Sequence, residues 1–403
     1  MKTKLTALTL CVATACGIAF FPAEGTVLPG QQTVKPITQP IVAPPTHERP
    51  KVEAVFVLDT TGSMSGLIEA AKEKIWSIAS TMAAAEPAPE IRIGLVAYRD
   101  RGDAYITKSV DLSSDLDSVY ATLMDFRAGG GGDGPESVNQ ALHDAVHGVS
   151  WSQEGQAYRV IFLVGDAPPH MDYQDDVKYP ETLEAAKRQG IVINTIQAGS
   201  NRSTTRVWER IASLGDGDYA RVDSDGDAVA MATPYDRELA KLSEELDATR
   251  VYYGSEAERA EKQKKVDAST KLHTLATVES RARRATFNAS ESGKANAFGD
   301  GELIEEVVSG RVDVDALAPS LLPEPMQALA PAEVKAEIAK KAEQRQELQQ
   351  KIDDLAEARS AYLRDKVEAE GGAEDSLDAK LYRSIKEQAA GSGLRYEAAA
   401  PAY

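Results

Sequence analysis

Apolar segments alternate with amphipathic segments along residues 51–250, and this alternation restricts the possible folds more than any other feature of the chain. Apolar runs predict five strands, at 52–58, 91–98, 160–164, 191–196 and 218–222. Helical spacing of apolar residues predicts helices at 65–85, 116–126, 137–149, 181–189 and 205–214. Strands alternating with helices are typical of βαβ units. We therefore predict an α/β fold with a doubly wound, mostly parallel sheet flanked by helices.

Acidic and hydroxyl side chains follow the predicted strands. The first strand runs into Asp-Thr-Thr-Gly-Ser at 59–63, the second ends at Asp100 and the third at Asp166. A glycine-rich loop carries Asp133 and is followed by Glu136. Because parallel sheets bind ligands beyond the carboxyl ends of their strands, we expect these side chains to converge. Oxygen donors of this kind suit a hard cation, Mg²⁺, Mn²⁺ or Ca²⁺.

Each of these residues also has an interpretation that needs no metal. The residue types at 59–63 are those that cap a helix N-terminus. Asp100 could form a salt bridge to a neighbouring arginine, and Asp133 could stabilise a turn. Acidic residues at matching strand ends favour the metal interpretation for 59–63, whereas both alternatives stay open for Asp100 and Asp133.

Four motifs, in chain order, resemble those of the von Willebrand factor A (VWA) domain. Residues 59–64, D-T-T-G-S-M, are similar to the D-x-S/T-x-S motif of its metal site, which is called MIDAS. The resemblance is greatest to the I-like domain of integrin β subunits and extends over about half of the chain. The further motifs are the strand at 92–100, D-G-P-E at 133–136 and D-A-P-P-H at 166–170.

The resemblance implies a role for each residue of the metal site. Thr61 and Ser63 would bind the ion through their hydroxyls, and Glu136 would be the ligand from the loop. Asp59 and Asp166 would act through bound water and by orienting the hydroxyls. The implied cofactor is Mg²⁺, with Mn²⁺ as the alternative, and an open position would accept a carboxylate from a protein partner.

A second metal site is implied less completely. Asp100 and Asp133 match two residues of a neighbouring site in integrin β subunits, which would hold Ca²⁺. Gly131 stands where that site uses Asn, so the match is partial. The acidic pair that builds a third integrin site is replaced by Ser-Gly-Leu at 65–67, and we predict no such site.

Charge and missing motifs narrow the class of function. A formal net charge of −18 argues against a nucleic-acid-binding role, because the phosphate backbone is also negatively charged. There is no G-x-S-x-G or H-E-x-x-H motif, and the chain is expected not to be an enzyme. The favoured function is an extracytoplasmic binding protein that captures a partner's acidic side chain through the bound cation. The alternatives are a structural envelope protein with a fold-stabilising ion and a metal-dependent hydrolase.

The N-terminus predicts export. Residues 1–23 have a short basic start and an apolar stretch typical of a signal peptide, in a bacterial style. Residues 24–50 are a Pro-rich linker. An A-x-A pattern precedes Cys16, which leaves cleavage, a lipid anchor on Cys16 and an uncleaved anchor as alternatives. We expect the periplasm or the cell surface, with membrane attachment only through this segment.

The remaining chain is expected to be mainly helical. A helix at 238–249 would pack on the sheet and end the VWA domain, predicted at 51–250, and a helical and loop extension would follow at 251–330. Residues 331–370 predict one long helix that forms a weak coiled coil, docks on a partner or packs on its own chain. Residues 371–403 would be helical and then disordered from Ala389.

Overall fold

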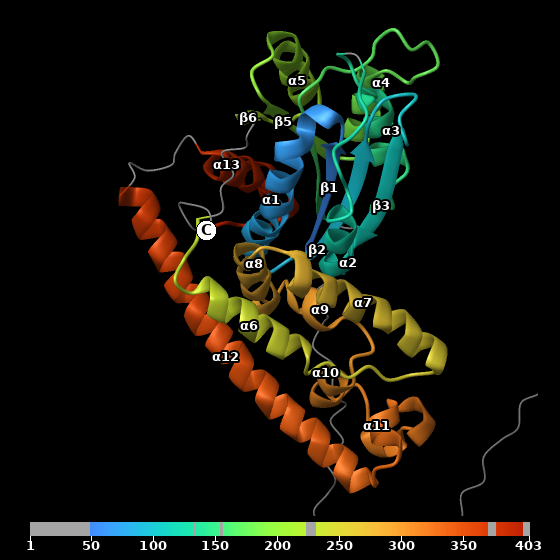
Figure 1. Cartoon of the computed structure of the whole chain (residues 1–403), viewed down its shortest axis with the longest axis vertical. Coiled ribbons are helices and arrows are strands. Elements are labelled where there is room, and N and C mark those ends of the chain that lie inside the picture. The colour runs from blue at the N-terminus through green and yellow to red at the C-terminus, as the bar shows by residue number, and fades with distance from the viewer. Residues whose placement is uncertain (1–48, 133, 154–155, 223–230, 370–375, 398–403) are drawn as a thin grey trace, which may run out of the picture. The chain divides into compact units, whose positions relative to one another are not determined.

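A six-stranded sheet with helices packed around it forms the α/β part of the computed structural model (Figure 1). Its order is β3-β2-β1-β4-β5-β6, and only the pairing of β2 with β3 is antiparallel. The predicted fold class is confirmed, and the antiparallel edge strand β3 is an element that the alternating pattern did not predict. The strands are β1 (Lys51–Asp59), β2 (Glu90–Tyr98), β3 (Thr107–Ser113), β4 (Ala157–Gly165), β5 (Ile191–Ala198) and β6 (Tyr219–Val222).

The structure describes residues 49–132, 134–153, 156–222, 231–369 and 376–397. The signal peptide predicted at 1–23, Cys16 and nearly all of the linker at 24–50 lie outside this part of the chain. Residues Glu48–Tyr403 form one compact unit, so the segments expected at 51–250, 251–330 and 331–370 pack together. Within the described residues, no helix is both long enough and apolar enough to cross a bilayer.

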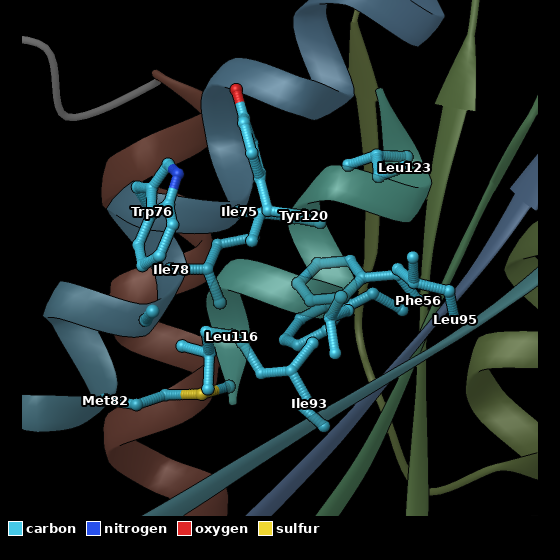
Figure 2. Close-up of a cluster of buried hydrophobic side chains, with 14 of the residues drawn as sticks. Phe56, Ile75, Trp76, Ile78, Met82, Ile93, Leu95, Leu116, Tyr120 and Leu123 are labelled. Atoms are coloured by element: carbon cyan, nitrogen blue, oxygen red, sulfur yellow. The ribbon is translucent and has the colours of Figure 1, made fainter. Parts of the chain in front are cut away.

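Two layers of helices cover the sheet. Alternate residues of β1 face opposite sides, so Phe56 joins one apolar cluster and Val57 the other. Figure 2 shows part of the first cluster, where Phe56 and Ile93 come from the strands and Ile78 comes from α1. One layer consists of α1 (Ser65–Ala83), α2 (Leu116–Leu123) and α13 (Leu377–Ala389), and the other of α3 (Val138–His147), α4 (Tyr179–Arg188) and α5 (Arg202–Leu214).

The chain leaves the sheet after β6. The helix expected at 238–249 is α6 (Asp236–Asp247), but its buried leucines pack against α8, α9 and α12 instead of the sheet. These helices and their neighbours form a helical region. It contacts the sheet-bearing part where α7 packs against α2 and α8 packs against α1. Its elements are α7 (Glu256–Leu275), α8 (Val278–Ala289), α9 (Lys294–Phe298), α10 (Leu303–Val308), α11 (Glu324–Gln327) and α12 (Pro331–Ala369).

The long helix α12 packs on its own chain, against α6, α8 and α10. Its buried positions include two arginines, Arg345 and Arg359, among mainly apolar residues. Arg345 binds both carboxylate oxygens of Glu302, at 2.9 and 3.0 Å, and Arg359 donates to Asp236 at 2.8 Å. Intramolecular ion pairs therefore explain why charged residues interrupt the apolar pattern.

The last helix returns to the sheet. Leu381, Tyr382 and Ile385 of α13 are buried in the same apolar cluster as Phe56, although they follow it by more than 300 positions (Figure 1). The segment beyond Ala389 was expected to be disordered, but Leu394 and Tyr396 are buried and Arg395 pairs with Glu86. The small-residue composition of this segment predicted disorder, but the two large side chains of Leu394 and Tyr396 are enough to pack it against the fold.

Candidate metal centre

The carboxyl end of β1 carries the first three candidate ligands in one hydrogen-bonded chain. Asp59 Oδ1 accepts from the backbone N of Thr61 at 2.9 Å and from its hydroxyl at 2.6 Å. The Thr61 hydroxyl lies 3.2 Å from the Ser63 hydroxyl. Asp59 and Thr61 are buried, whereas Ser63 is exposed. The motif therefore forms a polar path from the interior of the sheet to its surface.

The glycine-rich loop closes over this motif. Gly62 N donates to Gly130 O at 3.2 Å, and Gly131 N donates to Asp103 at 2.9 Å. Gly130 and Gly131 have φ of +80° and +76°, a conformation that favours glycine. A Cβ on Gly131 would lie 3.3 Å from Glu136 Oε1 and 3.5 Å from the Thr61 Cβ. These distances place the Glu136 carboxylate beside Thr61.

The loop after β4 holds Glu136 in place from the other side. Glu136 N donates to Pro168 O at 2.9 Å, and His170 N donates to Glu136 O at 3.0 Å. Asp166 is the first residue after β4, and the hydroxyl of Thr204 on α5 donates to its carbonyl at 3.0 Å. The strand order reverses between β1 and β4, so Asp59 and Asp166 flank the position where doubly wound sheets bind their ligands.

The charged residues of the centre shift the pKa values of two buried groups. Burial raises the pKa of Asp59 to about 7; hydrogen bonds from Thr61 lower it, and the charge of Asp166 raises it. Burial also raises the pKa of Tyr98 well above its usual value, and the charges of Asp59, Asp166 and Glu136 raise it further. The charges of all three carboxylates thus act on the Tyr98 hydroxyl.

This arrangement fits a cation. Asp59 Oδ2 is buried and makes no hydrogen bond of acceptable geometry with the described residues. A buried carboxylate without a counter-charge is costly, and a cation next to it would remove that cost. In the described chain no three Asp, Glu, His or Cys side chains gather as a metal cluster. A cation here would accordingly depend on the hydroxyls of Thr61 and Ser63 together with Glu136.

The residues predicted for a second site have a different environment. Asp100 accepts hydrogen bonds through both carboxylate oxygens, from the Ser137 hydroxyl at 2.8 Å and from the Tyr173 hydroxyl at 2.9 Å. His170 Nε2 lies 3.4 Å from the same carboxylate. These contacts replace the expected alternative of a salt bridge to Arg99 or Arg101. Asp133 lies outside the described residues.

Sequence reasoning missed three contributors to this centre. Asp103 links the loop to β2 through hydrogen bonds from Gly131 N and Asp100 N. Tyr98, the last residue of β2, lies opposite Asp59 in the parallel register. Gly165, the last residue of β4, lies against both of their side chains. The available signal was their position, since each stands at or just beyond a strand end next to a predicted ligand.

The chain is similar to proteins of a known family. Residues 53–228 match the family model described as the von Willebrand factor A domain. Among curated proteins, the alpha-protein kinase vwkA of Dictyostelium discoideum is 30% identical over 120 residues, which cover 30% of this chain and 19% of that protein. The chain spans only 11% and 19% of the length of the curated relatives it matches.

Part of the chain is similar to solved structures. Proximal thread matrix protein 1 from the mussel byssus, with a zinc-occupied MIDAS motif, is 17% identical with a TM-score of 0.36, covering 44% of this chain and 43% of its own. A von Willebrand factor type A protein from Catenulispora acidiphila is 16% identical with a TM-score of 0.34, covering 43% and 39%. The family match, the sheet order and the four motifs agree: residues 53–228 of this chain form a von Willebrand factor A domain.

Proposed function

We propose that this chain is a binding protein whose VWA domain holds a divalent cation, Mg²⁺ in the first instance, and binds a protein partner through that partner's carboxylate. The observation that carries the proposal is the chain of contacts from buried Asp59 through Thr61 to exposed Ser63. These contacts lead to the surface from a buried carboxylate, one oxygen of which accepts no hydrogen bond from the described residues. They lie where the strand order of the sheet reverses, between β1 and β4. Thr61, Ser63 and Glu136 would hold the ion, and Asp59 and Asp166 would orient the hydroxyls and bound water.

The donor set explains why a carboxylate is the expected partner group. Two of the three direct ligands are neutral hydroxyls, so the cation keeps part of its charge. Because Thr61 donates its proton to Asp59, its oxygen lone pairs are available to the ion. An incoming Asp or Glu side chain would supply the missing negative charge and occupy the remaining position.

Binding is favoured over hydrolysis by the state of the nearest histidine. His170 Nδ1 lies 2.8 Å from Asp172, and its ring is stacked on Tyr173 with centroids 4.0 Å apart. Its other ring nitrogen, Nε2, lies 3.4 Å from the Asp100 carboxylate, so both nitrogens face carboxylates and neither is directed at the proposed ion. Within the same proposal the protein acts outside the cytoplasm, in the periplasm or at the cell surface, without catalytic turnover.

A calorimetric Mg²⁺ titration of the full chain tests the metal site. We expect saturable binding that is lost in the Asp59→Ala/Glu136→Ala double variant. The control is Glu347→Ala/Asp365→Ala, which removes the same charge from exposed positions of α12 and should bind Mg²⁺ as the wild type does. Absence of binding in the folded wild type, or equal binding in both double variants, would overturn the metal site.

A peptide library tests the partner chemistry. Peptides that carry one Asp or Glu are screened against the immobilised chain in Mg²⁺ and again in chelator. We expect binders that need both the metal and the carboxylate, so that Asp→Asn or Glu→Gln in the peptide abolishes binding. Binders that survive chelation and the amide substitution would contradict recognition of a carboxylate by the cation.

A further inference from the structure

The Tyr98 hydroxyl and Asp59 Oδ2 are two buried polar atoms at the carboxyl ends of β2 and β1, next to the candidate metal centre. Both residues are 0% exposed and lie opposite each other in the pairing of β1 with β2. Neither the Tyr98 hydroxyl nor Asp59 Oδ2 makes a hydrogen bond of acceptable geometry with the described residues. Leaving a buried polar group without a hydrogen bond destabilises the folded chain, so two such atoms in one place require an explanation.

Gly165 shows how near these atoms are. A Cβ on Gly165 would lie 2.5 Å from the Tyr98 hydroxyl, 2.9 Å from Asp59 Cβ and 3.0 Å from Asp59 Oδ2. The Tyr98 hydroxyl and Asp59 Oδ2 therefore both border the space that a side chain at position 165 would fill. The glycine at the end of β4 allows the phenol from β2 and the carboxylate from β1 to approach the same point.

The two atoms are chemically complementary. Asp59 Oδ1 already accepts two hydrogen bonds from Thr61, which leaves Oδ2 as the oxygen with accepting capacity. An ionised carboxylate can only accept, whereas a phenol can donate its proton. The other charged groups that act on Tyr98 are the carboxylates of Asp166 and Glu136, which when ionised cannot donate to Asp59.

We propose that Tyr98 is a positioning residue of the metal centre, whose hydroxyl donates to Asp59 Oδ2 and fixes the carboxylate that orients Thr61 toward the cation. This inference rests on the proposed metal site. It adds a layer beneath the ligands: Tyr98 holds Asp59, Asp59 holds the Thr61 hydroxyl, and Gly165 provides the space. Partners of this kind typically change metal affinity about 10- to 100-fold when they are removed.

The test compares two tyrosine variants of the full chain. Tyr98→Phe keeps the buried ring and removes the hydroxyl. Tyr158→Phe is the matched control, because Tyr158 is a buried residue of β4 whose hydroxyl donates to Gln388 at 2.7 Å, away from the predicted ligands. Calorimetry should show a Kd for Mg²⁺ raised about 10-fold or more in Tyr98→Phe and changed less than about 2-fold in Tyr158→Phe.

A spectroscopic readout separates positioning from packing. Adding Mg²⁺ should produce a tyrosine difference band in the near-ultraviolet that persists in Tyr158→Phe and disappears in Tyr98→Phe. Gly165→Ala, which forces a methyl group between the two atoms, should weaken Mg²⁺ binding and remove the same band. Wild-type affinity together with an unchanged band in Tyr98→Phe would overturn the inference. A wild-type chain that binds no Mg²⁺ would instead overturn the proposed metal site on which it rests.

Discussion

The side-chain amides of Gln388 and Asn194 exchange two hydrogen bonds, of 2.8 and 3.0 Å, across 194 positions of the chain. Asn194 is a buried residue of β5, and the Tyr158 hydroxyl of β4 also donates to Gln388. This polar contact fixes α13 on the sheet at one place, while its apolar face covers the neighbouring cluster. The VWA domain is thus completed by a helix that lies far outside the segment matched by its family.

The packing of α13 predicts that its apolar residues stabilise the whole unit. Ile385 is 0% exposed and belongs to the cluster beneath the sheet. Ile385→Ala should lower the free energy of unfolding by about 2–5 kcal/mol, measured by denaturant titration of the full chain. Glu387→Ala, at an exposed position of the same helix, should change it by less than about 0.5 kcal/mol. Similar effects of both substitutions would mean that α13 contributes little to stability.

This helix also marks the limit of what the sequence could predict about the fold. The alternation of apolar and amphipathic segments predicted five of the strands, because β1, β2, β4 and β5 are mostly buried on both faces and β6 still carries buried Ala220 and Val222. The edge strand β3 was not predicted, because its residues at 107–113 are largely polar. Local spacing carries no information on which distant helix covers the sheet, so α6 was assigned the place that α13 occupies.

The candidate site was predictable to a similar extent. Asp59, Thr61, Glu136 and Asp166 could be found because strand ends and short motifs place them by chain order alone. The supporting contacts could not, since they depend on which side chains meet across strands. Tyr98 reads in sequence as one more apolar strand residue, and only the parallel register places it opposite Asp59.

A buried ion pair joins α2 of the VWA domain to the helical region. Arg284 of α8 donates to both carboxylate oxygens of Asp117, at 2.6 and 2.5 Å, and both side chains are 0% exposed. Asp117→Asn leaves the guanidinium without its main counter-charge and should lower the free energy of unfolding by about 3–5 kcal/mol. The control is Asp125→Asn, which breaks an exposed pair with Lys271 and should cost at most about 1 kcal/mol. Equal costs would contradict the importance of burial.

The same pair predicts a pH dependence. Burial alone would raise the pKa of Asp117, but the charge and hydrogen bonds of Arg284 outweigh it and hold the pKa well below its usual range. In the unfolded chain this carboxyl titrates at about pH 4, so on acidification the unfolded state takes up a proton before the folded state does. The difference in unfolding free energy between wild type and Asp117→Asn should be largest above about pH 5 and shrink as the pH falls through about 4. A difference that grows on acidification would contradict this assignment.

The contacts of Asp100 predict a structural role. Its carboxylate joins Ser137 of the glycine-rich loop region to Tyr173 of the loop after β4. Asp100→Asn should lower the free energy of unfolding by about 1–3 kcal/mol, because one of the two donors loses its acceptor. Calorimetry with Ca²⁺ in saturating Mg²⁺ should give no second binding event in either protein. A second event that Asp100→Asn abolishes would instead identify this residue as a ligand.

Binding of Mg²⁺ should also raise the thermal stability of the folded chain. An ion that binds only the folded chain stabilises it by about 2.7 kcal/mol at a free concentration 100 times its Kd. For a unit of about 350 residues that unfolds as a whole, with an unfolding entropy of about 2.1 cal/mol/K per residue, that corresponds to a rise in Tm of about 3–4 °C. Calorimetric scans should show the rise with Mg²⁺ in the wild type and in Glu347→Ala/Asp365→Ala, and no rise in Thr61→Val, which removes the hydroxyl between Asp59 and the ion. A rise that persists in Thr61→Val would place the stabilising ion elsewhere in the chain.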